Sequence, residues 1–434
     1  MVKSIRDDEI RKFYAQKALK FGEQTISPDE KPRRVTVLVN TSASQFKVMD
    51  RFQKNALPLL NLAGIQVDII KTESADQLES IASVLDKNEA DAIFIVGGDG
   101  TLARALTGIF KKFDSNKLPI GIFPGGNDNR GLLNLVPSVF TFRDDIRPIC
   151  ESAMAVIEER KRTVHPFKVE IVSTNPEEPP EPIYSLSDVS AGWYKVIEDY
   201  KHKFWYWGRL KRRWAYFWSM VKNSPEPFKV EVYYEQFCPG CKRCKMNKKL
   251  EEPKIQTQTQ ENQSWWRYFI GVPLIGTNKQ PQKLTPKKDY SKIENERCGE
   301  RHQLQLVGTD LIVDANQIED SVQLHFLIGG LLHDSRFSLL RDGWKRCKSD
   351  LVATSGDLKF YTNEFVANSV ELNFQHLPEN IKKIAISGDS KILDNYEEKV
   401  VKIQVTDKTA DVYLPTEIRV RIKEGSWFEL EERQ

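Results

Sequence analysis

A glycine-rich turn contains the residues whose types and order most directly indicate chemistry. It consists of Gly97, Gly98, Asp99, Gly100 and Thr101. The turn follows Ala92–Val96, a continuous apolar run typical of a strand buried on both faces, and a helical pattern begins at Leu102. Glycines let backbone N–H groups approach a ligand closely, and a helix N-terminus favours negative charge. The turn therefore predicts a binding site for phosphate groups.

Asp99 adds a second requirement to this site. Its carboxylate would repel a phosphate unless a divalent cation lay between the two groups, which indicates a metal-complexed nucleotide. The alternative is an ordinary strand-to-helix turn in which Asp99 caps the helix. The order of buried strand, Gly-Gly-Asp-Gly-Thr and helix is more specific than that alternative, so the nucleotide interpretation is favoured.

The elements around this turn predict a doubly wound parallel α/β sheet. From Arg34 onward, strand patterns alternate with helical patterns, which is typical of a parallel sheet with helices on both faces. The expected strands are Val35–Val39, Ile65–Ile70, Ala92–Val96 and Pro119–Phe123. Ligands bind beyond the carboxyl ends of such strands. The loops expected at those ends are Asn40–Ser44, Lys71–Thr72, Gly97–Thr101 and Pro124–Asn129, nearly all small, polar or glycine-rich.

A second, β-rich domain is expected after the parallel sheet. From Gln303 onward, short strand patterns separated by turns predict an antiparallel β-sandwich, with a cleft between the two domains. The predicted divisions are an N-terminal amphipathic arm and linker at 1–33, a nucleotide domain at 34–165 and a β domain at 166–425. Polar, weakly patterned segments at 245–263 and 279–301 are expected to be mobile insertions.

Aromatic and basic residues are concentrated at 201–222, which is expected to form one amphipathic helix. Its apolar face would carry Trp207, Leu210, Trp214, Phe217, Trp218 and Val221. Tryptophan favours the bilayer interface and basic residues pair with anionic head groups, so the pattern predicts docking on a membrane surface. The alternative is a helix packed on the β domain with solvated basic residues. The sequence leaves both interpretations open.

Three cysteines at two-residue spacing resemble half of a zinc or redox site: Cys238, Cys241 and Cys244. A closed zinc site needs a fourth ligand, which Cys298 or His302 could supply. A peripheral turn or a local disulfide is at least as good an interpretation, and nothing in the sequence ties these residues together.

Composition excludes several classes of protein. The net charge of +3 over 434 residues is too small to indicate a nucleic-acid partner. The chain has no apolar run of about eighteen residues that could span a bilayer, and its first residues lack the apolar core of a secretory signal. Six cysteines in a chain of this length do not indicate a disulfide scaffold.

With these loops placed, the chain resembles the diacylglycerol-kinase-like lipid kinases, which include sphingosine, ceramide and acylglycerol kinases. The strings that carry the resemblance are VLVN with FQKNALPLLNLAGIQVDIIKT, AIFIVGGDGTL and FWYWGRLKRRWAYFW. The resemblance extends over nearly the whole chain and is strongest to the mitochondrial acylglycerol kinases. It implies an α/β nucleotide domain followed by a β-sandwich.

The resemblance implies ATP and Mg²⁺ as cofactors. Gly97–Thr101 would hold the ATP phosphates, with Asp99 facing Mg²⁺. Asn40 and Thr41 match the family's Asn-Pro turn after the first strand, with threonine in place of proline. Thr72 matches a threonine that contacts the nucleotide in the family.

The second phosphate loop and the catalytic base depart from the family pattern. The loop contains Gly125 and Gly126 but continues Asn-Asp-Asn in place of Gly-Thr-x-Asn-Asp. For the base, the family has Asp-Gly-Glu at a strand end; here Asp389 is retained and Lys391 stands at the glutamate position. The candidate substitutes are Asp394 and Glu397. Without the resemblance, Asp389 could equally be an ordinary turn residue.

A family aspartate near the lipid substrate falls at about Val196 in this chain. The acidic residues that could compensate for its absence are Asp188, Glu198 and Asp199. The substrate side of the site is therefore expected to differ from the family pattern.

The implied function is an ATP- and Mg²⁺-dependent lipid kinase that phosphorylates a hydroxyl of monoacylglycerol or diacylglycerol, giving lysophosphatidic or phosphatidic acid. Ceramide or sphingosine is the alternative acceptor. A different class of function is a catalysis-independent subunit of the mitochondrial inner-membrane translocase for carrier proteins. NAD kinases share Gly-Gly-Asp-Gly, but a soluble substrate gives no reason for the aromatic and basic stretch at 201–222.

The resemblance also implies a location. Family members of this kind face the intermembrane space from the inner mitochondrial membrane, held by a hydrophobic N-terminal segment. That segment is missing from this sequence, so a cytosolic form stays open.

Overall fold

The computed structural model describes most of the chain in two compact units. The first comprises Met1–Phe237 with Arg301–Gln434, and the second comprises Cys238–Glu300. The described residues are 2–25, 31–43, 47–85, 89–112, 118–126, 129–141, 145–173, 180–222, 226–246, 293–318, 321–329, 340–341, 344, 361–423 and 429–432. Each unit is described separately below.

A parallel sheet forms the first half of unit 1, which confirms the expected fold class. Its strands, in spatial order, are β2 (Gln66–Thr72), β1 (Arg34–Asn40), β3 (Ala92–Gly97) and β4 (Ile120–Pro124). Every residue of β3 is buried, as its continuous apolar pattern predicts. Because all four strands run the same way, the loops after them gather at one edge of the sheet.

Helices cover this sheet and complete its core. They are α1 (Val2–Gly22), α2 (Val48–Asn55), α3 (Leu57–Leu62), α4 (Ala75–Val84), α5 (Asp99–Lys112), α6 (Arg130–Leu135), α7 (Pro137–Phe140) and α8 (Arg147–Ile157). Three buried rings, Phe52, Phe94 and Phe123, meet edge to face with centroids 5.7–6.4 Å apart. These contacts fix α2 against the two central strands of the sheet.

The first helix is part of this core, so the expectation of a separate N-terminal arm is wrong. Ile10, Tyr14 and Ala18 of α1 have no exposed surface and belong to the first hydrophobic cluster. Their spacing of four residues places all three on one face, which packs against α3 and α8. Residues 26–30 of the expected linker lie outside the described residues.

Residues near the C-terminus also join the first sheet. Strand β17 (Ala410–Tyr413) pairs in parallel with β4 and antiparallel with β5 (Lys161–Val164). Leu414, Ile418 and Val420 are buried in the same core. The assignment of this stretch to a β domain at 166–425 therefore differs from the structure, because the sequence cannot show which sheet edge a short late strand completes.

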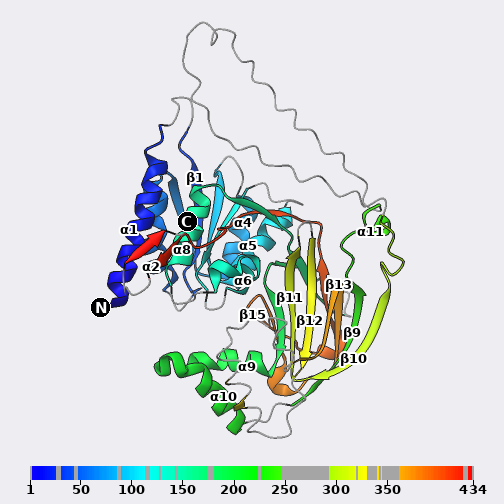
Figure 1. Ribbon diagram of the computed structural model, residues 1–434. Helices are drawn as coiled ribbons and strands as arrows, with labels where there is room; N and C mark the ends of the chain where they lie inside the picture. The colour runs from blue at the N-terminus through cyan, green and yellow to red at the C-terminus, as the bar shows by residue number, and fades with distance from the viewer. Residues whose placement is uncertain are drawn as a thin grey trace. The chain divides into compact units, whose positions relative to one another are not determined.

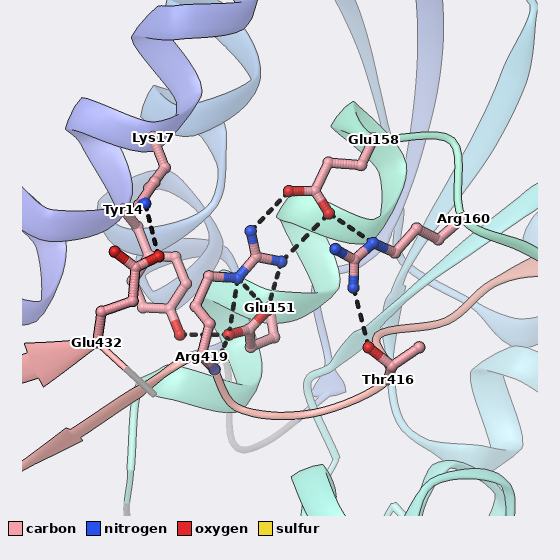
Figure 2. A network of polar contacts seen from close by, with 8 residues as sticks. All are labelled: Tyr14, Lys17, Glu151, Glu158, Arg160, Thr416, Arg419 and Glu432. Atoms are coloured by element: carbon pink, nitrogen blue, oxygen red, sulfur yellow. Dashed lines mark hydrogen bonds and ion pairs between the residues drawn. The ribbon is translucent and has the colours of Figure 1, made fainter. Parts of the chain in front are cut away.

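An ion-paired network holds this returning segment in place (Figure 2). The carboxylate of Glu151, on α8, is fully buried and accepts hydrogen bonds from the hydroxyl of Tyr14 at 2.6 Å and from the backbone N–H of Arg419 at 2.8 Å. The guanidinium of Arg419 also pairs with Glu158 at 2.6 Å. We call Tyr14, Glu151, Glu158 and Arg419 the terminal clamp, because they join α1, α8 and the C-terminal segment.

The second half of unit 1 is built from antiparallel strands. They are β6 (Phe167–Ser173), β7 (Ile183–Ser185), β8 (Asp188–Gly192), β9 (Phe228–Gln236), β10 (Arg301–Gly308), β11 (Asp310–Ile318), β12 (Ser321–Gly329), β13 (Tyr361–His376), β14 (Lys383–Ile386), β15 (Asp389–Ile392) and β16 (Lys399–Val405). The long strand β13 pairs with β12 through its first half and with β9 and β16 through its second. Figure 1 shows β11, β12, β13, β9 and β10 side by side. A small separate hairpin joins β18 (Val420–Ile422) to β19 (Leu430–Glu432).

The aromatic and basic stretch at 201–222 forms two short helices, so the expectation of one continuous helix is wrong. They are the 3₁₀ helix η2 (Lys201–Leu210) and α10 (Lys211–Lys222), and they follow α9 (Trp193–Tyr200). Gly208 adopts a φ of +51° and breaks the helical path, since this conformation is costly for other residues. Across the bend, the rings of Trp207 and Trp214 lie 4.3 Å apart.

One side of α10 packs on the β domain while another is exposed. Ala215 and Tyr216 are buried in the second core, as the packing interpretation expects. Large apolar side chains at least one-third exposed form what we call the aromatic surface: Tyr206, Trp207, Leu210, Phe217, Trp218 and Val221. Among the described helices, none is both long and apolar enough to cross a membrane.

Unit 2 is described only at its two ends, 238–246 and 293–300, with α11 spanning Lys242–Met246. The insertion expected at 245–263, and most of the one expected at 279–301, lie outside the described residues.

Candidate functional site

The two glycine loops lie against each other at the carboxyl edge of the parallel sheet. The backbone N–H of Gly125 donates to the carbonyl oxygen of Gly97 at 2.9 Å. A Cβ atom on Gly98 would lie 3.0 Å from the Cα of Gly126, and one on Gly126 would lie 2.7 Å from the Cα of Gly98. Glycine is therefore required at both positions because the two backbones approach too closely for a side chain.

Asp99 links these loops through its carboxylate. Its two oxygens accept the backbone N–H groups of Arg130 at 2.8 Å and Gly131 at 2.9 Å, which are the first two residues of α6. The negative charge thus lies at the positive end of a helix. As placed, Asp99 positions the second phosphate loop, and its expected role toward Mg²⁺ stays a prediction.

The turn after β1 borders the same loops. The side-chain amide of Asn40 donates to the hydroxyl of Thr101 at 3.0 Å, and its carbonyl oxygen accepts the backbone N–H of Ser42 at 3.1 Å. The backbone N–H and hydroxyl of Thr41 both donate to the carbonyl oxygen of Thr72 at 3.0 Å. The structure therefore joins the expected Asn40–Thr41 turn to the glycine-rich turn.

Thr72 itself is placed differently from its expected role. It has no exposed surface, and its hydroxyl donates to the carbonyl oxygen of Val39 at 3.2 Å. In this arrangement Thr72 holds the ends of β1 and β2 together and fixes the neighbouring turn, while its side chain offers no surface to a ligand.

Asp389 reaches the glycine-rich turn from the β half of unit 1. A Cβ atom on Gly100 would lie 2.8 Å from Oδ1 of Asp389, so the carboxylate occupies the space that a side chain would take. Ser387 and Gly388 form the tight turn before it with φ values of +52° and +84°, typical of a two-residue hairpin. The structure thus brings together two sites that are 289 residues apart in sequence, from Gly100 to Asp389.

Arg104, one turn into α5, lies beside this carboxylate. Its Nε is 3.5 Å from Oδ2 of Asp389, and its Nη1 is 3.1 Å from the carboxylate of Glu79. Burial would raise the pKa of Glu79, but hydrogen bonds from Lys111 and Arg104 outweigh this effect and hold that pKa below its ordinary value. Glu79 therefore stays ionised and keeps Arg104 in position.

A second acidic group, Asp188 and Asp314, lies behind the Asp389 turn. The carbonyl oxygen of Asp188 accepts the backbone N–H of Ser387 at 2.8 Å, and its carboxylate pairs with Arg130. Asp314 is directly opposite Asp188 in the pairing of β11 with β8. Desolvation and the neighbouring Asp188 raise the pKa of Asp314 to about 7, only partly offset by Arg130. Strongly shifted carboxyl groups of this kind cluster at functional sites.

The other acidic candidates lie elsewhere. Asp394 is exposed and follows Leu393, whose N–H bonds to Lys382 at the end of the hairpin opposite Gly388. Glu397 is exposed further on. Asp199 pairs with Lys195 and accepts a long hydrogen bond of 3.5 Å from Ser390, while the side chain of Glu198 lies outside the described residues. Of these carboxylates, Asp389 is the one in contact with the glycine-rich turn.

Arg104, Arg130 and Asp314 are absent from the sequence-based prediction. Arg104 could have been predicted as a site residue, because it lies five residues after Asp99 in the helix that begins at the glycine-rich turn. Asp314 had no such signal, since a charged residue alternating with apolar neighbours is also the pattern of a solvated strand face.

Comparison with known proteins relates this chain to a known family. Residues 34–167, which include both glycine loops, match the diacylglycerol kinase catalytic domain. An uncharacterised protein of Caenorhabditis elegans is 42% identical over 418 residues, which cover 96% of this chain and 91% of that protein. Mitochondrial acylglycerol kinase of Homo sapiens is 28% identical over 232 residues, covering 52% of each chain.

A crystal structure of a diacylglycerol kinase from Bacillus anthracis aligns with 89% of this chain and 98% of its own, at 14% identity and a TM-score of 0.46. The chain spans about half the length of the acylglycerol kinases that it matches. The match to the diacylglycerol kinase catalytic domain at the glycine loops and the similarity to mitochondrial acylglycerol kinase support one and the same family. This chain belongs to the diacylglycerol-kinase-like lipid kinases.

Proposed function

We propose that the protein transfers the γ-phosphoryl group of ATP to a hydroxyl of monoacylglycerol or diacylglycerol. The observation that carries this proposal is the contact between Asp389 and Gly100, which brings a carboxylate to the N-terminus of α5. A phosphate donor and a hydroxyl acceptor would have to meet at such a point.

The loop geometry supports nucleotide binding. Gly98 and Gly126 leave the backbone bare where the loops converge, at the N-terminal end of α5. The 14-residue α5 adds the positive end of its dipole. These features suit the triphosphate of ATP.

The donor set also fits Mg²⁺, which prefers carboxylate and other oxygen ligands. Asp99 is the carboxylate within the glycine-rich turn and would be its protein ligand. When bound, Mg²⁺ would neutralise charge on the phosphate groups.

Asp389 is proposed as the base that accepts the proton of the attacking hydroxyl. Its side chain is 45% exposed, so a lipid hydroxyl can reach it, and the guanidinium of Arg104, 3.5 Å away, orients it. Arg104 does not touch the reacting atoms in this proposal and acts as a positioning residue.

The aromatic surface is proposed to rest on a lipid bilayer. Tyr206, at 63% exposure, and Trp207 and Trp218 at about two-fifths have the amphipathic side chains that favour a bilayer interface. Lys203 and Lys211 lie in the same helices and would pair with anionic head groups. This placement would let a single lipid leave the membrane for the site.

The acylglycerol acceptor and a mitochondrial location rest on the similarity to acylglycerol kinases over half of this chain. Sphingosine kinase 2 of Homo sapiens, 32% identical over 113 residues, makes a sphingoid base the alternative acceptor.

The test is transfer of labelled γ-phosphate from ATP with Mg²⁺ to monoacylglycerol, diacylglycerol, ceramide and sphingosine in mixed micelles. Labelled lysophosphatidic or phosphatidic acid is the expected product. Asp389→Asn should lower the transfer rate by about 10²–10⁴-fold, the usual contribution of a positioned base. Asp394→Asn, the matched control at the far end of the hairpin, should leave the rate unchanged.

Labelled ceramide or sphingosine instead would replace the proposed acceptor. Equal rates for Asp389→Asn and the unmodified protein would remove Asp389 as the base. ATP binding without transfer to any of the four lipids would contradict the kinase proposal and favour the catalysis-independent role as a translocase subunit.

A further inference from the structure

We propose that four cysteines of unit 2 bind one structural Zn²⁺ ion: Cys238, Cys241, Cys244 and Cys298. Their four sulfur atoms all lie within 4.8 Å of one another. Cys238 and Cys241 are buried, and the other two are partly exposed. The site is independent of the proposed kinase chemistry.

The distances between the sulfur atoms favour a metal over a disulfide. Sγ of Cys244 lies 3.7 Å from Sγ of Cys241 and 3.9 Å from Sγ of Cys238. In a disulfide the sulfur atoms are about 2.0 Å apart. Four sulfurs at about 2.3 Å from a central zinc form a tetrahedron with edges of about 3.8 Å, which matches these two separations.

Hydrogen bonds to the sulfur atoms support the same interpretation. The backbone N–H of Cys241 donates to Sγ of Cys244 at 3.2 Å, and the side-chain amide of Asn295 donates to Sγ of Cys238 at 3.4 Å. Donors of this kind stabilise thiolates and orient them toward a metal. Such donors would give little stabilisation to the neutral sulfur atoms of a disulfide.

The backbone is shaped to present these thiols from two separate stretches. Gly240 has a φ of +136° between the first two cysteines, and Gly299 has a φ of +83° directly after Cys298. Both conformations favour glycine. The N–H of Lys242 donates to the carbonyl oxygen of Ile293 at 2.9 Å, so the two stretches are also joined through the backbone.

Four thiolates complete a tetrahedral shell and leave no open position for a substrate, which is typical of a structural site. The ion would join two stretches that are distant in sequence, 238–246 and 293–300. A polynuclear iron–sulfur cluster fits less well, since its cysteines bind different iron atoms and lie further apart.

Cys298 is the fourth ligand in this proposal, and His302 is not. His302 belongs to β10 of unit 1, where its ring packs against Tyr234 with centroids 5.2 Å apart. The sequence left these two residues as alternatives, and the sulfur cluster selects the cysteine.

The test is the metal content of the full-length protein purified under reducing conditions without chelator, measured by inductively coupled plasma mass spectrometry. One zinc per chain is expected. Cys241→Ser and Cys298→Ser should lose it, while His302→Gln and Cys150→Ala, a cysteine in α8 outside the cluster, should retain it.

Cobalt substitution of the unmodified protein tests the ligand set even if the cysteine variants fail to fold. Thiolate-to-cobalt charge transfer with the strong visible bands of tetrahedral cobalt is the expected spectrum. A metal-free protein, a disulfide among these cysteines in peptide mapping, bound iron in place of zinc, or full zinc retention in Cys298→Ser would each overturn the proposal.

Discussion

Two clusters of charged side chains in unit 1 differ in how completely basic groups neutralise their carboxylates. In the terminal clamp, Arg419 contacts both Glu151 and Glu158, and Arg160 adds a second cation to Glu158 at 2.7 Å (Figure 2). Behind the candidate site, Asp188 and Asp314 lie opposite each other on the paired strands β8 and β11. The guanidinium of Arg130 forms an ion pair with Asp188.

The difference appears in the pKa values. In the clamp, burial would lower the pKa of Arg419, but the two glutamates raise it above its ordinary value, so the ion pairs are held firmly. Behind the site, burial and a like charge raise the pKa of Asp314 to about 7. Removing a charge from the terminal clamp should therefore destabilise the protein, whereas neutralising Asp314 should stabilise it.

Breaking the terminal clamp should lower the free energy of unfolding by the largest amount. Arg419→Met leaves the buried carboxylate of Glu151 without its guanidinium, so the free energy of unfolding should fall by about 3–5 kcal/mol. Arg421→Met, the matched control, removes an exposed pair with Glu431 and should change it by about 0–1 kcal/mol. Urea denaturation measures both. Equal effects would mean that burial does not distinguish the two pairs.

The substitution Gly100→Ala should lower the rate of phosphoryl transfer much more than it changes the free energy of unfolding. In Gly100→Ala the new Cβ meets Oδ1 of Asp389, and this half-exposed side chain can swing away. Phosphoryl transfer should fall about 100-fold from the displaced carboxylate, while the free energy of unfolding changes by less than about 1 kcal/mol. A kinase assay and urea denaturation of the same preparation test this. An unchanged rate of phosphoryl transfer would show that transfer does not depend on the position of Asp389 beside Gly100.

Neutralising Asp314 should stabilise the protein, the reverse of the clamp variant. Because its pKa is raised when folded, the folded chain keeps this proton between about pH 4 and 7 while the unfolded chain loses it. This contribution to stability is full below pH 4 and is lost as the pH rises to 7. Asp314→Asn should therefore gain on the order of 2 kcal/mol at pH 8 and nothing at pH 4. The same gain at both pH values would exclude titration as its cause.

The smallest effect is expected at Asp99. Asp99→Ala removes the acceptor of the first two N–H groups of α6, so unfolding should become easier by about 1 kcal/mol in the absence of nucleotide and metal. Thermal unfolding in chelator measures this. A variant as stable as the unmodified protein would assign Asp99 to ligand binding alone.

Local signals made the parallel-sheet half of the fold and the place of its two glycine loops predictable. Strand β3 is apolar throughout because it is buried on both faces, and the glycines after it are needed by backbones in contact. Asp389 could be proposed only through the resemblance, since its own turn is an ordinary hairpin.

Other features depend on contacts that no local pattern encodes. The burial of α1 and the return of β17 follow from which faces meet in three dimensions, and a short apolar stretch fits either sheet equally well. The bend at Gly208 is hidden because a single glycine is tolerated in many helices. Raised pKa values, as at Asp314, arise only when strands distant in sequence pair.

The position of β17 has a consequence for how the protein is made. Strand β4 pairs with β17, yet Ala410–Tyr413 is synthesised after all the strands β6–β16 of the antiparallel half. Until then the nucleotide half emerges with an open sheet edge and an incomplete core, a state prone to wrong pairing. Because the chain is synthesised from its N-terminus, the first half of the fold completes its sheet only after Ala410–Tyr413 has been made, and premature termination before Ala410 should yield an aggregation-prone chain rather than a working fragment.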